Sequence, residues 1–80
     1  MHRFRIDAIV DAQSLPRIAG FFAQRAIVPD DMSMRIADGR MLIDVAVAGL
    51  CPARAAVIAA KLGELYAVLD AGCERREPVA

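Results

Sequence analysis

The sequence predicts an α+β domain with a ferredoxin-like βαββαβ sandwich, in which two helices pack on one face of a four-stranded antiparallel sheet. Three observations predict it. Residues 3–10 alternate between apolar and charged side chains, as a half-buried strand does. A helical apolar stripe follows, and Asp38-Gly39 between two further alternating segments is the strongest short hairpin signal. Two helices stacked on such a sheet bury its apolar face together with their own stripes.

The first strand and the first helix follow from two different periods. Alternate positions of residues 3–10 form one apolar face, made of Phe4, Ile6, Ala8 and Val10. We expect Ser14 or Asp11 to cap the helix that follows, and Pro16 fits a first turn, where amides lack a partner within the helix. Helical spacing predicts that the buried face, flanked by Phe21, consists of Leu15, Ile18, Ala19 and Phe22.

The predicted hairpin joins strands at residues 32–37 and 40–48. Proline cannot continue a helix, so Val28-Pro29 ends the first helical unit. Methionines on one face of a sheet are usually flexible core filler, and we expect that role for Met32, Met34 and Met41. One face of the third strand is apolar throughout and consists of Met41, Ile43, Val45 and Val47.

The second helix is predicted to open at Pro52 and to run to about Leu62, near Gly63. Its inward face is expected to consist of Ala55, Ile58, Leu62 and Leu65. The apolar segment 66–73 then fits a last strand. We expect one domain over residues 1–73 and a flexible C-terminal tail over residues 74–80.

The composition of the chain favours self-association and argues against binding to nucleic acid or to a membrane. The chain has 80 residues and is 58% hydrophobic, and a domain so small buries only about 60% of the surface of its unfolded chain. Some apolar surface must therefore be covered, which predicts a homodimer or higher homo-oligomer. The formal net charge of +0 argues against nucleic acid. No apolar run is long enough to span a membrane, and no signal peptide opens the chain. We expect a cytoplasmic protein with Cys51 and Cys73 as buried free thiols.

Catalytic chemistry is sparse in this sequence. The histidine, His2, is expected to be a disordered imidazole at the N-terminus, and Ser14 and Ser33 have no histidine to activate them. Asp30-Asp31 is interpreted as a solvated loop rather than a metal or acid/base site. The middle strands lack the aromatic side chains with which an RNA-recognition domain of this fold would stack bases. We therefore expect no enzyme activity, no metal and no cofactor.

The chain resembles the ACT domains, which are regulatory modules on many enzymes of amino-acid metabolism. In particular, it resembles the short single-domain regulatory (small) subunits of acetolactate synthase, an enzyme of branched-chain amino-acid biosynthesis. The resemblance covers about residues 4 to 73. It rests on the order and spacing of Leu15-x-Arg17-Ile18-Ala19-Gly20-Phe21-Phe22 with Arg25, Met32-Ser33-Met34, and Lys61-Leu62-Gly63-Glu64-Leu65 with Val68.

The resemblance implies a dimer whose two sheets join side by side, with effector amino acids bound in the seam by two loops. The implied ligand-binding residues are Asp11, Ala12, Gln13, Ser14, Leu15 and Val28. Ala12-Gln13 stand where the family usually has Pro-Gly, so a side chain lies where close backbone approach is needed. Ala26 and Val28 stand where it usually has glycine and often asparagine. Ala26 must adopt a left-handed conformation or change the helix ending.

Three functions remain open from the sequence. The first is a non-catalytic regulatory protein that dimerises and modulates a separate catalytic subunit such as acetolactate synthase. The second is an amino-acid sensor with an altered pocket at the dimer seam. Carboxylates gain from free amides at the start of the first helix, whereas Gln13 and Val28 remove the expected contacts. The third is a purely structural domain that self-associates without a ligand.

Overall fold

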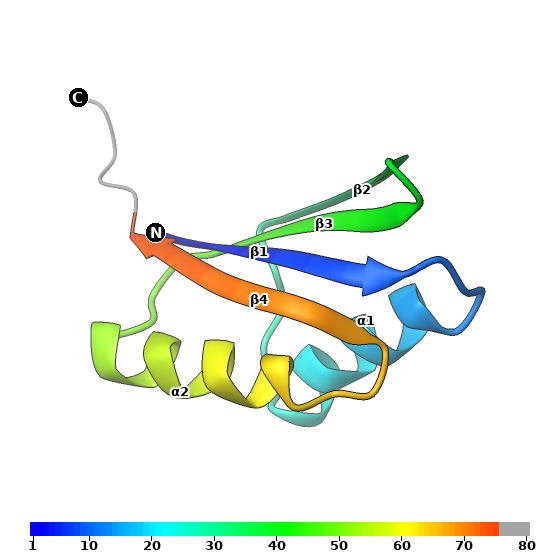
Figure 1. Ribbon diagram of the computed structural model, residues 1–80. Coiled ribbons are helices and arrows are strands. Elements are labelled where there is room, and N and C mark those ends of the chain that lie inside the picture. The colour runs from blue at the N-terminus through cyan, green and yellow to red at the C-terminus, as the bar shows by residue number, and fades with distance from the viewer. Residues whose placement is uncertain (76–80) are drawn as a thin grey trace.

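The computed structural model describes residues 1–75 and has the predicted element order. The elements are β1 (His2–Ile9), α1 (Ser14–Gln24), β2 (Asp31–Ala37), β3 (Arg40–Val47), α2 (Pro52–Gly63) and β4 (Val68–Arg75). The strands pair antiparallel in the order β2-β3-β1-β4, and both helices lie on one side of this sheet (Figure 1). The ferredoxin-like α+β fold is therefore confirmed.

The core lies between the sheet and the two helices. Its centre is Phe22 of α1, whose ring meets the ring of Phe4 edge-on, with centroids 5.7 Å apart. Phe21 packs against Phe22 in the same manner at 5.4 Å. The sheet contributes the predicted apolar faces of β1 and β3, and α2 contributes Ala55, Ile58 and Leu62. The alternation was thus interpreted correctly from Phe4 to Ala8 in β1 and from Met41 to Val47 in β3, and so was the stripe of α2 up to Leu62, whereas Leu65 lies beyond the end of that helix.

The α1 helix differs from its predicted stripe. Ile18 and Phe22 are buried as expected and Leu15 packs at the edge of the core, but Ala19 is exposed and Phe21 is buried. A phenyl ring removes far more apolar area from water than a methyl group does. The helix is therefore rotated so that Phe21 faces the core and Ala19 faces solvent.

The start of α1 also corrects the predicted cap. Gln13 is the N-cap residue and makes no side-chain cap bond, while Ser14 is the first helical residue and is fully buried. The Ser14 hydroxyl donates to the carbonyl oxygen of Ile9 at 2.8 Å, and the Ile9 amide donates to the carbonyl oxygen of Ala67 at 2.9 Å. These bonds fix the end of β1 at Ile9. Val10 consequently lies outside the strand and is exposed, contrary to its predicted place on the buried face.

The α1 helix ends in a left-handed residue. Ala26 has φ 56°; its amide donates to the carbonyl oxygen of Ala23, and the amide of Ile27 donates to that of Phe22, each at 3.0 Å. This pair of bonds is the Schellman motif, in which glycine usually occupies the left-handed position. Of the two alternatives predicted for Ala26, the strained conformation is the one adopted.

The β2–β3 hairpin turns at Asp38 and Gly39, which have φ values of 54° and 73°. Two successive positive φ angles are typical of the type I′ turn that the sequence pattern predicts. β2 lies at the edge of the sheet. Its register places Met34 opposite Ile43 and Ile36 opposite Met41, on the side that faces the helices. Met34 and Ile36 are nevertheless exposed, so the expectation of core filler holds for Met41 and is wrong for Met34.

The second half of the chain follows the prediction except at the last strand. Pro52 opens α2 and Gly63 ends it. β4 begins at Val68 rather than at Tyr66, because residues 64–67 form a turn that is closed by a bond from the Val68 amide to the Leu65 carbonyl oxygen at 3.0 Å. β4 continues through Glu74 to Arg75, two residues past the predicted end of the strand. Residues 76–80 of the predicted tail lie outside the described residues. No helix within residues 1–75 is long and apolar enough to cross a membrane.

Ala26 offers a direct test of the helix ending. We expect Ala26→Gly to raise the free energy of unfolding by about 1 kcal/mol, because glycine adopts the left-handed conformation without the penalty of a Cβ. Urea denaturation followed by circular dichroism measures this change. The matched control is Ala23→Gly inside α1, which should lower the free energy of unfolding by about 0.5–1 kcal/mol. Destabilisation by Ala26→Gly would contradict the left-handed assignment.

Candidate functional site

The loop between β1 and α1, together with the first turn of α1, carries five of the six ligand-binding residues implied by the resemblance. Asp11, Gln13 and Ser14 line a hollow of about 70 Å³ together with Arg17 and Tyr66, far below the roughly 300–1,000 Å³ of ordinary ligand pockets. The loop satisfies its own polar groups, since Asp11 Oδ1 accepts a bond from the Gln13 amide at 2.8 Å. A ligand carboxylate approaching this amide would meet the carboxylate of Asp11.

The remaining implied site residues, Ala12, Leu15 and Val28, do not line that hollow, and Ser14 lines it from a buried position. Ser14 is fully buried with its hydroxyl already bonded, Leu15 packs against the core, and Ala12 is exposed. Val28 is 86% exposed and lines a different hollow. The structure therefore does not bring Val28 together with residues 11–15 within one chain.

The hollow beside Val28 is the larger and the more apolar of the two. It measures about 620 Å³ and is lined by Ala19, Ala23, Ala26, Ile27, Val28, Pro29 and Met32. Sequence reasoning missed Ala19 because it was placed on the inward stripe, and it did not consider Ala23; the rotation of α1 turns both outward. An alanine where a larger apolar residue would fill the core better is the signal that could have identified them.

An apolar surface continues from this hollow along the edge strand. We call it the β2 edge surface, and it consists of Ala19, Ala23, Val28, Met32, Met34 and Ile36. Ile36 is 60% exposed and Met34 is 40% exposed. Within residues 1–75 the outer side of β2 pairs with no strand. An edge strand with exposed apolar neighbours is a template for pairing with another chain.

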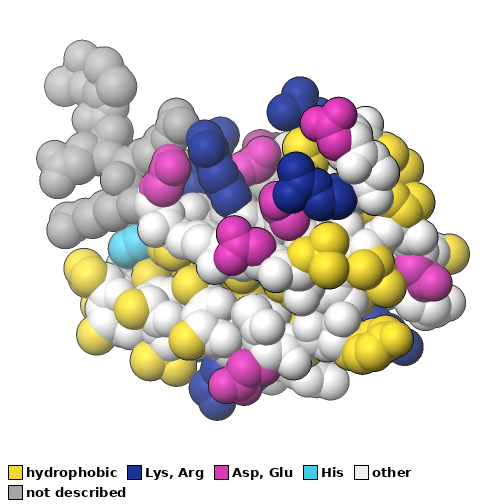
Figure 2. Space-filling view, viewed as in Figure 1, with side chains coloured by type: hydrophobic (Ala, Val, Ile, Leu, Met, Phe, Trp, Pro, Cys, Tyr) yellow, Lys and Arg dark blue, Asp and Glu magenta, His cyan; other side chains and the backbone are white. Residues whose placement is uncertain are grey.

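The uncovered face of the sheet has the opposite character. Figure 2 shows charged side chains gathered over the sheet and hydrophobic ones along the outer side of α2. Arg5 lies 3.8 Å from Asp44 and 3.7 Å from Glu74, and Arg40 lies 2.9 Å from Asp7. Exposed ion pairs of this kind contribute at most about 1 kcal/mol each. This face is a solvated surface of an antiparallel sheet.

His2 and the two cysteines correct further expectations. His2 is 4% exposed on β1, rather than disordered, and its Nδ1 has no hydrogen-bond partner among the described residues. Cys51 is exposed rather than buried and caps α2, where its Sγ accepts from the Arg54 amide at 3.4 Å. Cys73 is half-buried. Burial and, to a lesser degree, the neighbouring Glu74 carboxylate raise the pKa of the Cys73 thiol above its ordinary value.

Asp30 joins the loop before β2 to the end of β3 through two hydrogen bonds. Its Oδ2 accepts a hydrogen bond from the Ala48 amide at 2.7 Å, and its own amide donates to the Ala46 carbonyl oxygen at 2.8 Å. Asp30 and Asp31 are both exposed. Among residues 1–75 no three histidine, cysteine or acidic side chains are grouped closely enough to hold a metal ion.

Comparisons with known proteins bear on this arrangement. The family model of the ACT-like domain matches residues 1–78. The solution structure of the C-terminal domain of the MgtC protein from Mycobacterium tuberculosis is similar, with a TM-score of 0.64 and 16% sequence identity. The match covers 91% of this chain and 83% of that domain. At this identity the likeness shows the fold alone. A comparison with curated proteins finds no significant match.

The cysteines should differ in reactivity. We expect iodoacetamide at pH 7.5 to modify the exposed Cys51 first and Cys73 much more slowly, because Cys73 is half-buried and the raised pKa of its thiol lowers its thiolate fraction. Mass spectrometry of timed samples measures both rates. In the control variant Cys51→Ser only the slow phase should remain. Equal rates for both thiols in the folded protein would contradict the placement of Cys73.

Proposed function

This chain belongs to the ACT-like domain family, whose model matches nearly its whole length, and we propose that it is a non-catalytic regulatory domain. In this proposal the chain self-associates along the β2 edge surface and modulates a separate catalytic subunit. The observation that supports this proposal is the apolar edge of β2, which pairs with no further strand among residues 1–75.

The energetics of that edge support self-association. Fully burying a side chain such as isoleucine or methionine gains about 1.5–3 kcal/mol, and Ile36, Met34 and Val28 all offer exposed apolar area. A second copy that adds its own β2 would also satisfy the free amides and carbonyls of the strand. Because such contact is symmetric, the same surface serves both copies.

The catalytic partner is proposed from the resemblance. The candidate partner is the catalytic subunit of acetolactate synthase. In this proposal the chain acts in the cytoplasm and regulates the synthesis of branched-chain amino acids. The small hollow beside Asp11 supports a regulator that acts through protein contact rather than through the usual effector, since the loop amide of Gln13 is already bonded to Asp11.

A second candidate function is an amino-acid sensor with an altered pocket. The hollow beside Val28 favours it, because β2-to-β2 association would bring two such apolar hollows to one seam. Their lining selects a ligand with an apolar side chain. If neither a catalytic partner nor an effector binds, the remaining alternative is a purely structural domain that self-associates without a ligand.

Charge on the β2 edge surface should abolish self-association. We expect the wild-type protein to have at least twice the chain mass of 8.6 kDa at micromolar concentration, and Met34→Glu/Ile36→Glu to have the mass of one chain. Burying four carboxylates in a symmetric seam costs more than the apolar contact gains. Light scattering coupled to size exclusion measures the mass. The matched control is Leu69→Glu on β4, an exposed apolar residue at the other edge. A monomeric wild-type protein would refute the proposal.

A pull-down tests the catalytic partner. Immobilised wild-type protein should retain the acetolactate synthase catalytic subunit of the same organism and change its rate. Met34→Glu/Ile36→Glu separates a requirement for self-association from a direct contact. No retention together with an unchanged rate removes this partner from the proposal.

Calorimetry tests the sensor function. Valine, leucine and isoleucine at millimolar concentration should release or absorb heat with the wild-type protein if the seam is a pocket. Ala23→Gln fills the hollow from α1 and should remove that heat, whereas Ala53→Gln, on the exposed start of α2, should not. Absence of heat with the wild-type protein refutes the sensor function for these ligands.

A further inference from the structure

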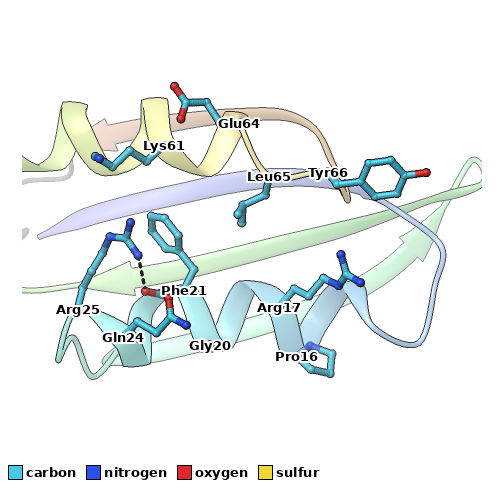
Figure 3. Close-up of a pocket in the computed structure, with 10 residues that line it drawn as sticks. All are labelled: Pro16, Arg17, Gly20, Phe21, Gln24, Arg25, Lys61, Glu64, Leu65 and Tyr66. Atoms are coloured by element: carbon cyan, nitrogen blue, oxygen red, sulfur yellow. Dashed lines mark hydrogen bonds between the residues drawn. The ribbon is translucent and has the colours of Figure 1, made fainter.

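A groove between α1 and α2 lies on the other side of α1 from the β2 edge surface. It measures about 620 Å³ and is lined by Pro16, Arg17, Gly20, Phe21, Gln24, Arg25, Lys61, Glu64, Leu65 and Tyr66. Figure 3 shows Arg17, Phe21, Arg25 and Leu65 pointing into the space between the helices. Nothing in the proposed self-association uses this groove.

The groove concentrates positive charge on a chain whose net charge is +0. Arg17, Arg25 and Lys61 line it, and none of them makes a salt bridge with a described side chain. The acidic residue of the lining, Glu64, directs its carboxylate away from α1 (Figure 3). Three other carboxylates, those of Asp7, Asp44 and Glu74, lie near arginines on the far face of the sheet. The lining of the groove thus carries three cations and one carboxylate.

One of these cations is held in place. The Arg25 guanidinium stacks over the Phe21 ring at 3.7 Å from its centroid and donates a hydrogen bond to the Phe21 carbonyl oxygen at 3.0 Å. Stacking fixes the plane of the guanidinium, and most of its five N–H donors remain available. A carboxylate entering the groove would therefore meet a donor that is already oriented.

Gly20 keeps the groove open. A Cβ added at this position would have no described atom within 4 Å outside the helix itself, so space rather than crowding surrounds it. Glycine inside a helix costs about 0.5–1 kcal/mol relative to alanine. Its presence in α1 leaves the floor between Arg17 and Phe21 without a side chain, and Leu65 and Tyr66 supply apolar contact from the opposite wall.

We propose that the groove between α1 and α2 binds an acidic segment of a partner protein. Exposed ion pairs are worth about 0.2–1 kcal/mol each, so one small anion would be held weakly by these separate cations. A peptide with several glutamates or aspartates can pair with Arg17, Arg25 and Lys61 at once while its apolar side chains cover Leu65 and Tyr66. Charge complementarity of this kind also speeds the encounter of two proteins.

Fluorescence anisotropy with a defined probe tests the proposal. The probe is a fluorescein-labelled peptide of sequence Glu-Glu-Leu-Glu-Glu-Leu-Glu-Glu, and its control has glutamine in place of every glutamate. We expect the wild-type protein to bind the acidic probe and not the control, with affinity falling on the order of tenfold between low salt and about 300 mM salt because salt screens exposed charges. No binding of the acidic probe at low salt would overturn the proposal.

Three variants locate the binding. Arg17→Gln/Lys61→Gln should weaken binding about tenfold by removing two ion pairs. Gly20→Leu should weaken it as well, although it leaves the charge unchanged. The matched control, Arg3→Gln/Arg35→Gln, removes the same charge from the sheet face and should change affinity less than about twofold. Equal loss in the control variant would overturn the proposal, because it indicates non-specific attraction.

Two further measurements keep the result interpretable. Circular dichroism checks that each variant is folded. If Arg17→Gln/Lys61→Gln does not fold, the single variant Lys61→Gln takes its place. Displacement of the probe by inorganic phosphate at equal concentration would overturn the proposal in favour of a small-anion site. Light scattering on the same samples reports self-association separately, so loss of one property does not imply loss of the other.

Discussion

The position of α1 is set by one contact, and the surfaces of the molecule depend on it. Phe22 meets Phe4 edge-on and Phe21 edge-on, so the helix can lie on the sheet in one rotation only without exposing a ring. That rotation turns Ala19 and Ala23 outward beside β2. It also turns Arg17 and Arg25 towards α2. The apolar edge and the cationic groove are therefore two sides of the same helix, placed by the same aromatic packing.

Much of this fold could be predicted from short-range signals. Asp38-Gly39, Pro52 and the alternation of β3 each act within a few residues, and each was interpreted correctly. The errors lie where tertiary contact decides. Period alone favours Ala19 over Phe21, whereas the larger ring wins the buried place. The sequence pattern likewise does not show that the Ser14 hydroxyl bonds to the Ile9 carbonyl oxygen. Nor does it show that His2 is buried, which follows from the position of β1 between β3 and β4 in the sheet.

The candidate site was less predictable than the fold. The residues implied by the resemblance were treated as one set, but in a single chain Asp11, Gln13 and Ser14 line one hollow and Val28 lines another. Loop sequences cannot show that Asp11 already occupies the amide of Gln13. The exposure of Met34 and Ile36 depends on strand order, because the same alternating pattern in a central strand would be buried.

The two hydrogen bonds made by Asp30 have a consequence for any chain that pairs with β2. They tie the start of the edge strand to the end of β3, and the tight turn at Asp38-Gly39 ties its other end. Ordering the backbone of a residue costs about 1–2 kcal/mol in lost conformational entropy. Because β2 is already ordered in the single chain, the β2 of a second copy arrives ordered as well, and pairing of the two strands costs little of this entropy.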